Sequence, residues 1–117
     1  MSPVGLYRVQ NAKGEGPYNS EDRPHRFEST VFRTFLNRHR DADRHPAPHA
    51  DGLGYPERRE FCAFASLDSL GSWFSAQEIQ ALAHHGFHVC RIWVDEKHIR
   101  RGRAQVLYVS TKARTYA

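Results

Sequence analysis

Histidines and cysteines are the residues of this 117-residue chain best suited to hold a metal or to act as base and nucleophile. His45 and His49 are four residues apart, a spacing that on a helix presents both rings to one metal. Prolines between them forbid a regular helix, and no cysteine or carboxylate stands at an ordinary zinc spacing. His84 and His88 have the same spacing, but Gly86 ends the helix between them. The sequence therefore predicts no metal site.

Both cysteines, Cys62 and Cys90, lie in apolar stretches, a pattern typical of buried and unreactive thiols. His88 would share a strand face with Cys90, but an apolar strand does not stabilise a thiolate. Neither a Gly-x-Ser-x-Gly nucleophile motif nor a phosphate-binding Gly-x-x-x-x-Gly-Lys-Ser/Thr loop is present. The sequence thus contains no complete catalytic motif.

The charge balance favours an acidic partner. Lys and Arg number 17 against 13 Asp and Glu, for a formal net charge of +4, and much of the positive charge is arginine. Nucleic acid, an acidic protein face or a nucleoprotein complex would suit such a surface. No apolar run approaches a membrane-spanning length, and no signal peptide is recognisable at Met1. We therefore expect a cytoplasmic protein without membrane contact.

The elements that would position these residues follow from periodicity and turn signals. Strands are predicted over 5–10, 60–65, 87–95 and 106–110, and helices over 27–39, 67–74 and from 76 to about 85. The order predicts an α+β fold: a small mixed or mostly antiparallel sheet with two to three helices packed on it. We expect one domain over 1–117, with a long polar loop at about 41–59, and a tail over 111–117 that frays.

Local signals mark the ends of the helices. Ser66 is predicted to cap a short helix, and Ser75 with Glu78 forms a capping box. Gly86 suits the position after the helix that follows. The strand over 87–95 is apolar on both faces, which predicts a central place in the sheet. Its nearness in sequence to the last strand favours an antiparallel hairpin, or a closely neighbouring pair, formed by these two strands.

Three segments resemble a known signature. Leu6-Tyr7-Arg8-Val9 is a first strand with an arginine, Phe61 to Leu67 is a strand that ends in serine, and Gln105 precedes a late strand. Their order resembles the Arg–Ser–Glu signature of the ADP-ribosyltransferase-like fold. In that family the Arg and Ser shape an NAD pocket, and the Glu polarises a ribose hydroxyl.

The resemblance implies that Arg8 and Ser66 would bind NAD, while Gln105 stands in the place of the catalytic Glu. Glutamine accepts a hydrogen bond but carries no charge to stabilise a cationic transition state, a loss of about a hundredfold or more in rate. Glu96 is a poorer substitute for the catalytic Glu, since it lies before the polar connector over 97–103 and not at the start of the last strand. The plainer interpretation makes Arg8 a charge on the strand surface and Ser66 a helix cap.

The chain also resembles small proteins encoded by bacteriophages and prophages. The shared features are Leu6 to Val9, Gly16-Pro17-Tyr18, the Pro/His-rich 45–49 segment, and Phe64 to Leu67 with Trp73-Phe74. Such proteins are often accessory, and several classes block host defence by binding its effector complexes.

Together these observations favour a non-enzymatic phage-type protein that needs no cofactor and inhibits a host defence complex, as an anti-CRISPR does. Its expected partner is a host protein or nucleoprotein complex, bound through Tyr55, Arg58, Arg59 and Arg101, because Tyr and Arg are favoured at binding hot spots. The alternative is an NAD-dependent ADP-ribosyltransferase that uses Arg8 and Ser66. A second alternative is a small nucleic-acid-binding protein that grips phosphates with its arginines.

Overall fold

The computed structural model describes residues 3–18, 38–40 and 45–116. The helix predicted over 27–39 lies outside the described residues, apart from its last two positions. The described strands are β1 (Pro3–Gln10), β2 (Glu60–Ala63), β3 (His88–Asp95), β4 (Ile99–Arg101), β5 (Val106–Val109) and β6 (Arg114–Tyr116). The described helices are α2 (Leu67–Trp73) and α3 (Ala76–His84), with short 3-10 helices η2 (Pro48–Asp51), η3 (Glu96–His98) and η4 (Ser110–Lys112).

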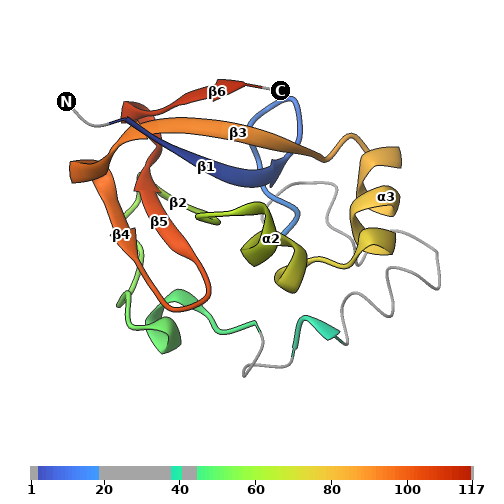
Figure 1. Cartoon of the computed structure of the whole chain (residues 1–117), viewed down its shortest axis with the longest axis horizontal. Coiled ribbons are helices and arrows are strands. Elements are labelled where there is room, and N and C mark those ends of the chain that lie inside the picture. Colours follow the sequence, from blue (N-terminus) through green and yellow to red (C-terminus); the bar gives the residue numbers. More distant parts are fainter. Residues whose placement is uncertain (1–2, 19–37, 41–44, 117) are drawn as a thin grey trace.

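Within the described residues the strands form two antiparallel sheets of three strands, ordered β1–β3–β6 and β2–β5–β4. Figure 1 shows the first sheet along the top of the molecule, the second below it, and α3 at the right-hand end. The sheets meet where Tyr7 and Phe64 exchange two backbone hydrogen bonds of 2.8 Å. This is the α+β fold that the sequence predicted, with every described strand pair antiparallel.

The core divides into two apolar clusters. One lies between the helices and the ends of β1 and β3, and contains Val9, Phe64, Leu70, Trp73, Phe74, Leu82 and Phe87. The other lies between the two sheets, and contains Leu6, Ala63, Ile92, Val94, Val106 and Tyr108. The strand β1 contributes to both clusters, because successive side chains point to opposite faces of a strand.

The predicted helix ends are confirmed. Ser66 caps α2 by accepting a hydrogen bond of 3.1 Å from the backbone N–H of Ser69. At the start of α3, Ser75 Oγ accepts from the Glu78 N–H at 3.2 Å, and Glu78 Oε1 accepts from the Ser75 N–H at 2.7 Å. Gly86 follows α3 with a φ of +85°, a conformation that favours glycine.

The strand β3 is central in its sheet, as its apolar sequence predicted, but its expected pairing with β5 is wrong. The connector between them forms η3 and β4, and β4 turns back onto β5 through a Gly102 N–H to Gln105 C=O hydrogen bond of 2.9 Å. The hairpin partner of β5 is therefore β4. The expectation of a frayed tail is also wrong up to residue 116, because β6 pairs with β3.

Candidate functional site

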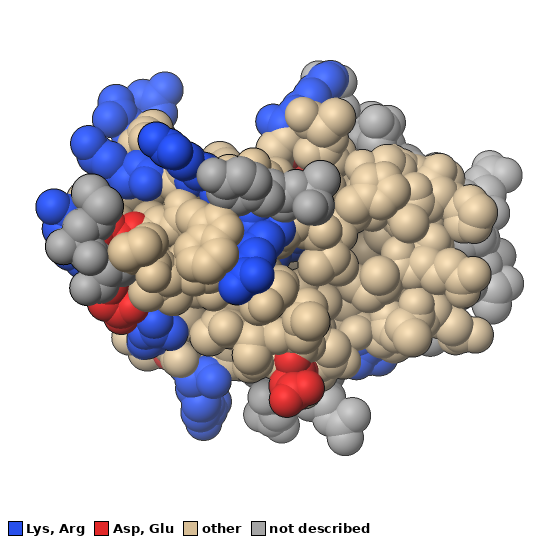
Figure 2. Space-filling view, turned by 45° about the horizontal axis from the view of Figure 1, so that its top comes forward, with Lys and Arg blue, Asp and Glu red and all other residues tan. Residues whose placement is uncertain are grey.

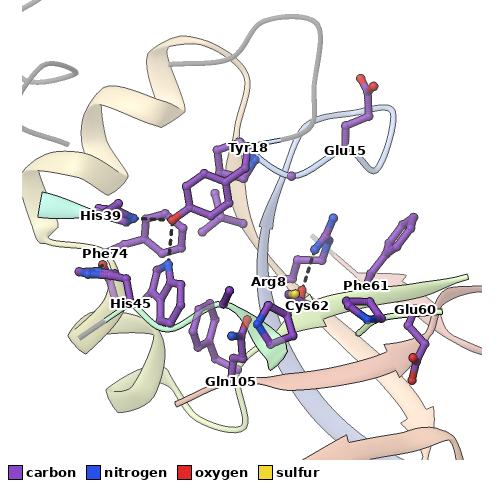
Figure 3. A pocket seen from close by; sticks show the side chains of 18 of the residues that line it. Arg8, Glu15, Tyr18, His39, His45, Glu60, Phe61, Cys62, Phe74 and Gln105 are labelled. Atoms are coloured by element: carbon purple, nitrogen blue, oxygen red, sulfur yellow. Dashed lines mark hydrogen bonds between the residues drawn. The ribbon is translucent and has the colours of Figure 1, made fainter. Parts of the chain in front are cut away.

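A cavity of about 710 Å³ lies beside β1 and β2, within the size range of small-molecule sites (Figure 3). One side is formed by β1, the turn after it and β2, and the other by the polar loop and the end of α2. The described lining residues are Arg8, Val9, Lys13, Gly14, Glu15, Gly16, Pro17, Tyr18, His39, His45, Pro46, Ala47, Pro48, Pro56, Glu60, Phe61, Cys62, Phe64, Trp73, Phe74 and Gln105. Most of the exposed surface of this wall is apolar, as is usual in ligand pockets, and a minority of the lining residues are polar or charged.

Arg8 is the buried cation of this wall, with only 9% of its surface exposed. Its Nη1 donates to the Cys62 carbonyl at 2.6 Å, its Nε to Gln10 Oε1 at 3.1 Å, and its Nη2 to the Gly14 carbonyl at 3.4 Å. The guanidinium carbon also lies 4.8 Å from the centroid of the Phe61 ring. The interpretation of Arg8 as a surface charge is therefore wrong. The acceptors are all neutral, and no described carboxylate pairs with Arg8.

The turn after β1 holds Arg8 from one side. Asn11 Oδ1 accepts from the backbone N–H groups of Lys13 and Glu15, at 3.0 and 2.9 Å. Gly14 has a φ of +80°, which a residue with a side chain would adopt only at a cost. A Cβ at Gly16 would lie 3.2 Å from Arg8 Nη2. The two glycines thus let the turn approach the guanidinium closely.

Gln105 also reaches the cavity, and its position is set by a buried carboxylate. Asp51, which is 5% exposed, accepts from the backbone N–H groups of Ala104 and Gln105, at 2.9 and 3.0 Å to Oδ2. The Gln105 side-chain amide donates to the Pro46 carbonyl at 2.7 Å. The structure therefore brings together Arg8 and Gln105, two of the three residues that the ADP-ribosyltransferase resemblance singled out.

Ser66, the third of these residues, is not among the described residues that line the cavity. Its hydroxyl caps α2 and also donates to Ser69 Oγ at 3.1 Å. Glu96, the substitute acid, pairs with Arg101 on the connector and is also outside the lining. The carboxylates that do line the cavity are Glu15 and Glu60, and Figure 3 shows both pointing away from Arg8.

These two carboxylates already have partners. Glu60 accepts two hydrogen bonds from Arg100, at 2.8 and 2.6 Å, and these hold its pKa below the usual value despite partial burial. Glu15 Oε1 accepts from Asn11 Nδ2 at 3.1 Å. Lys13 adds a second positive charge to the lining. The charge of Glu60 is balanced locally, whereas that of Arg8 is not.

An aromatic wall forms the other end of the cavity. The indole Nε1–H of Trp73 donates to the Tyr18 hydroxyl at 2.8 Å, and that hydroxyl hydrogen-bonds to His39 Nδ1. His39 Nε2 lies 3.1 Å from Glu78 Oε1. A carboxylate only accepts, so Nε2 carries the proton and Nδ1 accepts from Tyr18. The phenol ring also stacks on Phe74, with centroids 6.4 Å apart.

Glu78 anchors this network from within the capping box. Arg38 donates to both of its carboxylate oxygens, at 3.1 and 2.5 Å. Burial raises the pKa of Glu78, but the hydrogen bonds from Arg38, Ser75 and His39 outweigh burial and leave the pKa lowered. Burial lowers the pKa of His39 to about 4, so its ring is neutral near pH 7. Burial also raises the pKa of Tyr18, which keeps its phenol protonated.

His45 stacks on His39 with ring centroids 4.1 Å apart, and is 6% exposed. Its Nε2 lies 2.7 Å from the Trp73 carbonyl and so carries the proton. The other nitrogen, Nδ1, is buried without a hydrogen-bond partner in the described part of the chain. The polar loop thus lines the cavity with a buried histidine, which its composition did not suggest.

The residues predicted to bind a partner lie elsewhere. Tyr55 is 80% exposed and stacks on His49 with centroids 5.0 Å apart, while Arg58 and Arg59 are exposed. Arg101 is exposed and donates two hydrogen bonds to Glu96, at 3.1 and 2.9 Å. None of these four residues lines the cavity.

Neither the two cysteines nor the histidines form a reactive or metal-binding group in the described part of the chain. Cys62 and Cys90 are free and half-buried, not fully buried as predicted, and burial raises the pKa of both. Among residues 3–18, 38–40 and 45–116, no three His, Cys, Asp or Glu side chains are grouped so as to hold a metal. No helix in this part of the chain is long and apolar enough to span a bilayer.

A comparison with protein families assigns the chain to a family. The model of the bacteriophage T4 Y00F protein family matches residues 1–117. The chain belongs to the Y00F family. Membership confirms the phage character that the sequence suggested, because the family takes its description from a phage protein. No curated protein and no solved structure shows a significant match to this Y00F protein.

Proposed function

We propose that this phage protein binds a nucleotide with a pyrophosphate, of the NAD type, in the cavity beside Arg8. The observation that carries the proposal is the state of Arg8, a residue that is only 9% exposed and whose guanidinium contacts only neutral acceptors among the described residues. A buried charge is costly unless an opposite charge compensates for it. A bound phosphate would supply that charge, and guanidinium is well shaped to hold one.

Other residues of the cavity wall suit the second phosphate and the base of a nucleotide. Lys13 adds a cation at the phosphate end, and the rings of Trp73 and Phe74 offer apolar surface for a base at the other. The described acceptors use three of the five N–H groups of Arg8, which leaves two for a ligand. This assignment agrees with the NAD pocket that the ADP-ribosyltransferase resemblance implies for Arg8.

The same geometry supports binding rather than ADP-ribosyl transfer. Gln105 stands where the family has an acid, and its amide is held by Pro46. Ser66 is occupied in capping α2, and Glu60 is paired with Arg100. We therefore propose a non-enzymatic nucleotide-binding protein that acts in the cytoplasm of the host.

Isothermal titration calorimetry tests this proposal with NAD, ADP-ribose and adenosine. We expect ADP-ribose and NAD to bind and adenosine to bind much more weakly, because adenosine lacks the pyrophosphate. Arg8→Met should weaken ADP-ribose binding about 10- to 100-fold, the usual value of a charge-assisted contact, and Arg8→Lys should weaken it less. Arg103→Met, at an exposed arginine on the turn before β5 that does not line the cavity, is the matched control and should bind as the wild type does.

Equal affinity for adenosine and ADP-ribose, or full affinity in a folded Arg8→Met variant, would refute the proposal. Chromatography of the NAD after incubation tests the enzymatic alternative separately. Release of nicotinamide that stops in Arg8→Met would establish the ADP-ribosyltransferase-type activity in place of simple binding.

A second candidate is contact inhibition of a host defence complex, as by an anti-CRISPR protein. The observation in its favour is the surface around Tyr55, whose ring is 80% exposed and is followed by the exposed Arg58 and Arg59. Affinities for purified CRISPR effector complexes test it. The Arg58→Glu/Arg59→Glu double variant should bind at least about tenfold more weakly, whereas Arg8→Met should bind unchanged. An unchanged affinity in the double variant would remove this surface from consideration.

A further inference from the structure

The outer face of the β1–β3–β6 sheet carries aromatic and arginine side chains together. Residue pairs directly opposite each other in a sheet share a face, and the register pairs Tyr7 with Arg91, Gly5 with Trp93, and Trp93 with Arg114. Arg91 and Arg114 are exposed, while Tyr7 and Trp93 are half-buried. Leu6 and Ile92, on the opposite face of the same strands, are fully buried in the core between the sheets.

Arg91 lies across this face between two rings. Its guanidinium carbon is 4.4 Å from the centroid of the Trp93 ring and 5.7 Å from that of Tyr7. Gly5 makes room for it, because a Cβ at that position would lie 3.0 Å from Arg91 Nε. Cation–π contacts at these distances hold the guanidinium in place. No described residue accepts a hydrogen bond from its N–H groups, which leaves them for a ligand.

The charge on this face is uncompensated. Neither Arg91 nor Arg114 pairs with a carboxylate among the described residues, unlike Arg100 and Arg101, which each do. Asp95 is the acidic residue on this face of β3; it lies at the strand's end and accepts a hydrogen bond from the Lys97 N–H at 3.3 Å. Figure 2 shows Lys and Arg side chains gathered on the strand-bearing side of the molecule, and few on the side of α3.

From this arrangement we infer that the outer face of the β1–β3–β6 sheet binds single-stranded nucleic acid. Exposed bases stack on aromatic rings and on guanidinium planes, and neighbouring cations contact the phosphates. Trp93 and the Arg91 guanidinium offer the two kinds of stacking surface, and Arg114 supplies a second cation beside Trp93. Tyr7, whose ring also packs against the apolar cluster beside the helices, supports Arg91 from the other side. A duplex is not expected to bind well here, because its bases are already stacked. The site is distinct from the cavity, because Tyr7, Arg91, Trp93 and Arg114 are all absent from the described lining of the cavity.

Fluorescence anisotropy with labelled oligo-dT and oligo-rU of about 15 nucleotides tests this inference at several salt concentrations. Trp93→Ala should weaken binding about tenfold or more, and Trp93→Phe should keep most of the affinity because it keeps a ring. Arg91→Gln and Arg114→Gln should each weaken binding and flatten its salt dependence by about one phosphate contact. Arg103→Gln, an exposed arginine on the turn before β5, is the matched control and should bind as the wild type does.

Thermal unfolding checks that each variant is folded. If Trp93→Ala does not fold, the Arg91→Gln variant still tests the inference. Several outcomes would overturn the inference: no binding by the wild type at low salt, an equal loss in Arg103→Gln, or tighter binding to duplex than to single strands. Equal binding to polyglutamate with no loss in Trp93→Ala would show a surface for acidic protein segments and would also overturn it. Nucleotide binding in the cavity is measured separately, so the two proposals can fail independently.

Discussion

Two arginines of this protein, Arg38 and Arg8, donate hydrogen bonds to buried groups, and the two sets of acceptors differ in charge. Arg38 meets the buried carboxylate of Glu78 through two hydrogen bonds and also donates to the Trp73 carbonyl. Arg8 is more deeply buried, yet among the described residues its guanidinium donates only to two backbone carbonyls and a glutamine. The first arrangement balances its own charge and is complete without a ligand. The second leaves a positive charge facing a cavity, which is what an anion site requires.

The largest effect on stability is expected at Arg38, His39 and Glu78, a charge-balanced cluster that we call the Arg38 centre. Glu78→Ala removes the carboxylate that joins Arg38, His39 and the capping box, and should lower the free energy of unfolding by about 3–5 kcal/mol. Urea unfolding measures this. Glu96→Ala is the matched control: it breaks an exposed ion pair with Arg101 and should leave the urea midpoint unchanged. Similar small losses in both variants would contradict a structural role for the Arg38 centre.

The same centre predicts how stability depends on pH. Burial lowers the pKa of His39 from 6.5 to about 4, so the unfolded chain binds a proton there at a pH at which the folded protein does not. Stability should therefore fall as the pH drops from 6.5 to about 4, by about 3 kcal/mol. The lowered pKa of Glu78 acts in the same direction at lower pH, since its stabilisation is lost as the carboxylate is protonated.

Urea unfolding across this pH range measures the effect. His39→Gln should flatten the dependence between pH 6.5 and 4, whereas His88→Gln, at an exposed position, should not. A wild-type protein whose stability is constant over that range would contradict the buried, neutral state of His39.

The smallest of these effects separates helix capping from ligand binding at Ser66. Ser66→Ala should lower the free energy of unfolding by about 1 kcal/mol, because the cap of α2 is lost. ADP-ribose affinity should not change, since Ser66 does not line the cavity. Ser72→Ala, an exposed position in the same helix, controls for the loss of a hydroxyl. A large drop in affinity with Ser66→Ala would restore Ser66 to the binding site.

Local features of this fold could be predicted from the sequence because short-range chemistry determines them. The caps at Ser66 and Ser75 depend on groups three residues away, and the central place of β3 follows from its own apolar composition. The partner of β5 could not be predicted in this way. It depends on how β4 turns at Gly102, and a sequence pattern does not reveal which strand edges meet.

The candidate site also contains some residues that the sequence indicated and others that it did not. The resemblance pointed to Arg8 and Gln105, but the acceptors that hold them, Cys62 and Pro46, are 54 and 59 residues away in the chain. The aromatic wall could not be predicted, because apolar spacing is the same for a buried ring and for one that lines a cavity. The burial of His45 inside a polar loop had no signal in the sequence, since loop composition does not tell which residue folds inward.

The central claim is that the uncompensated charge of Arg8 marks an anion site for a nucleotide. A crystal structure of the complex with ADP-ribose tests it most directly. We predict a phosphate oxygen within about 3.2 Å of the Arg8 guanidinium, and the adenine against the Trp73–Phe74 end of the cavity. A structure in which ADP-ribose binds elsewhere while Arg8 keeps only its present neutral acceptors would contradict the claim.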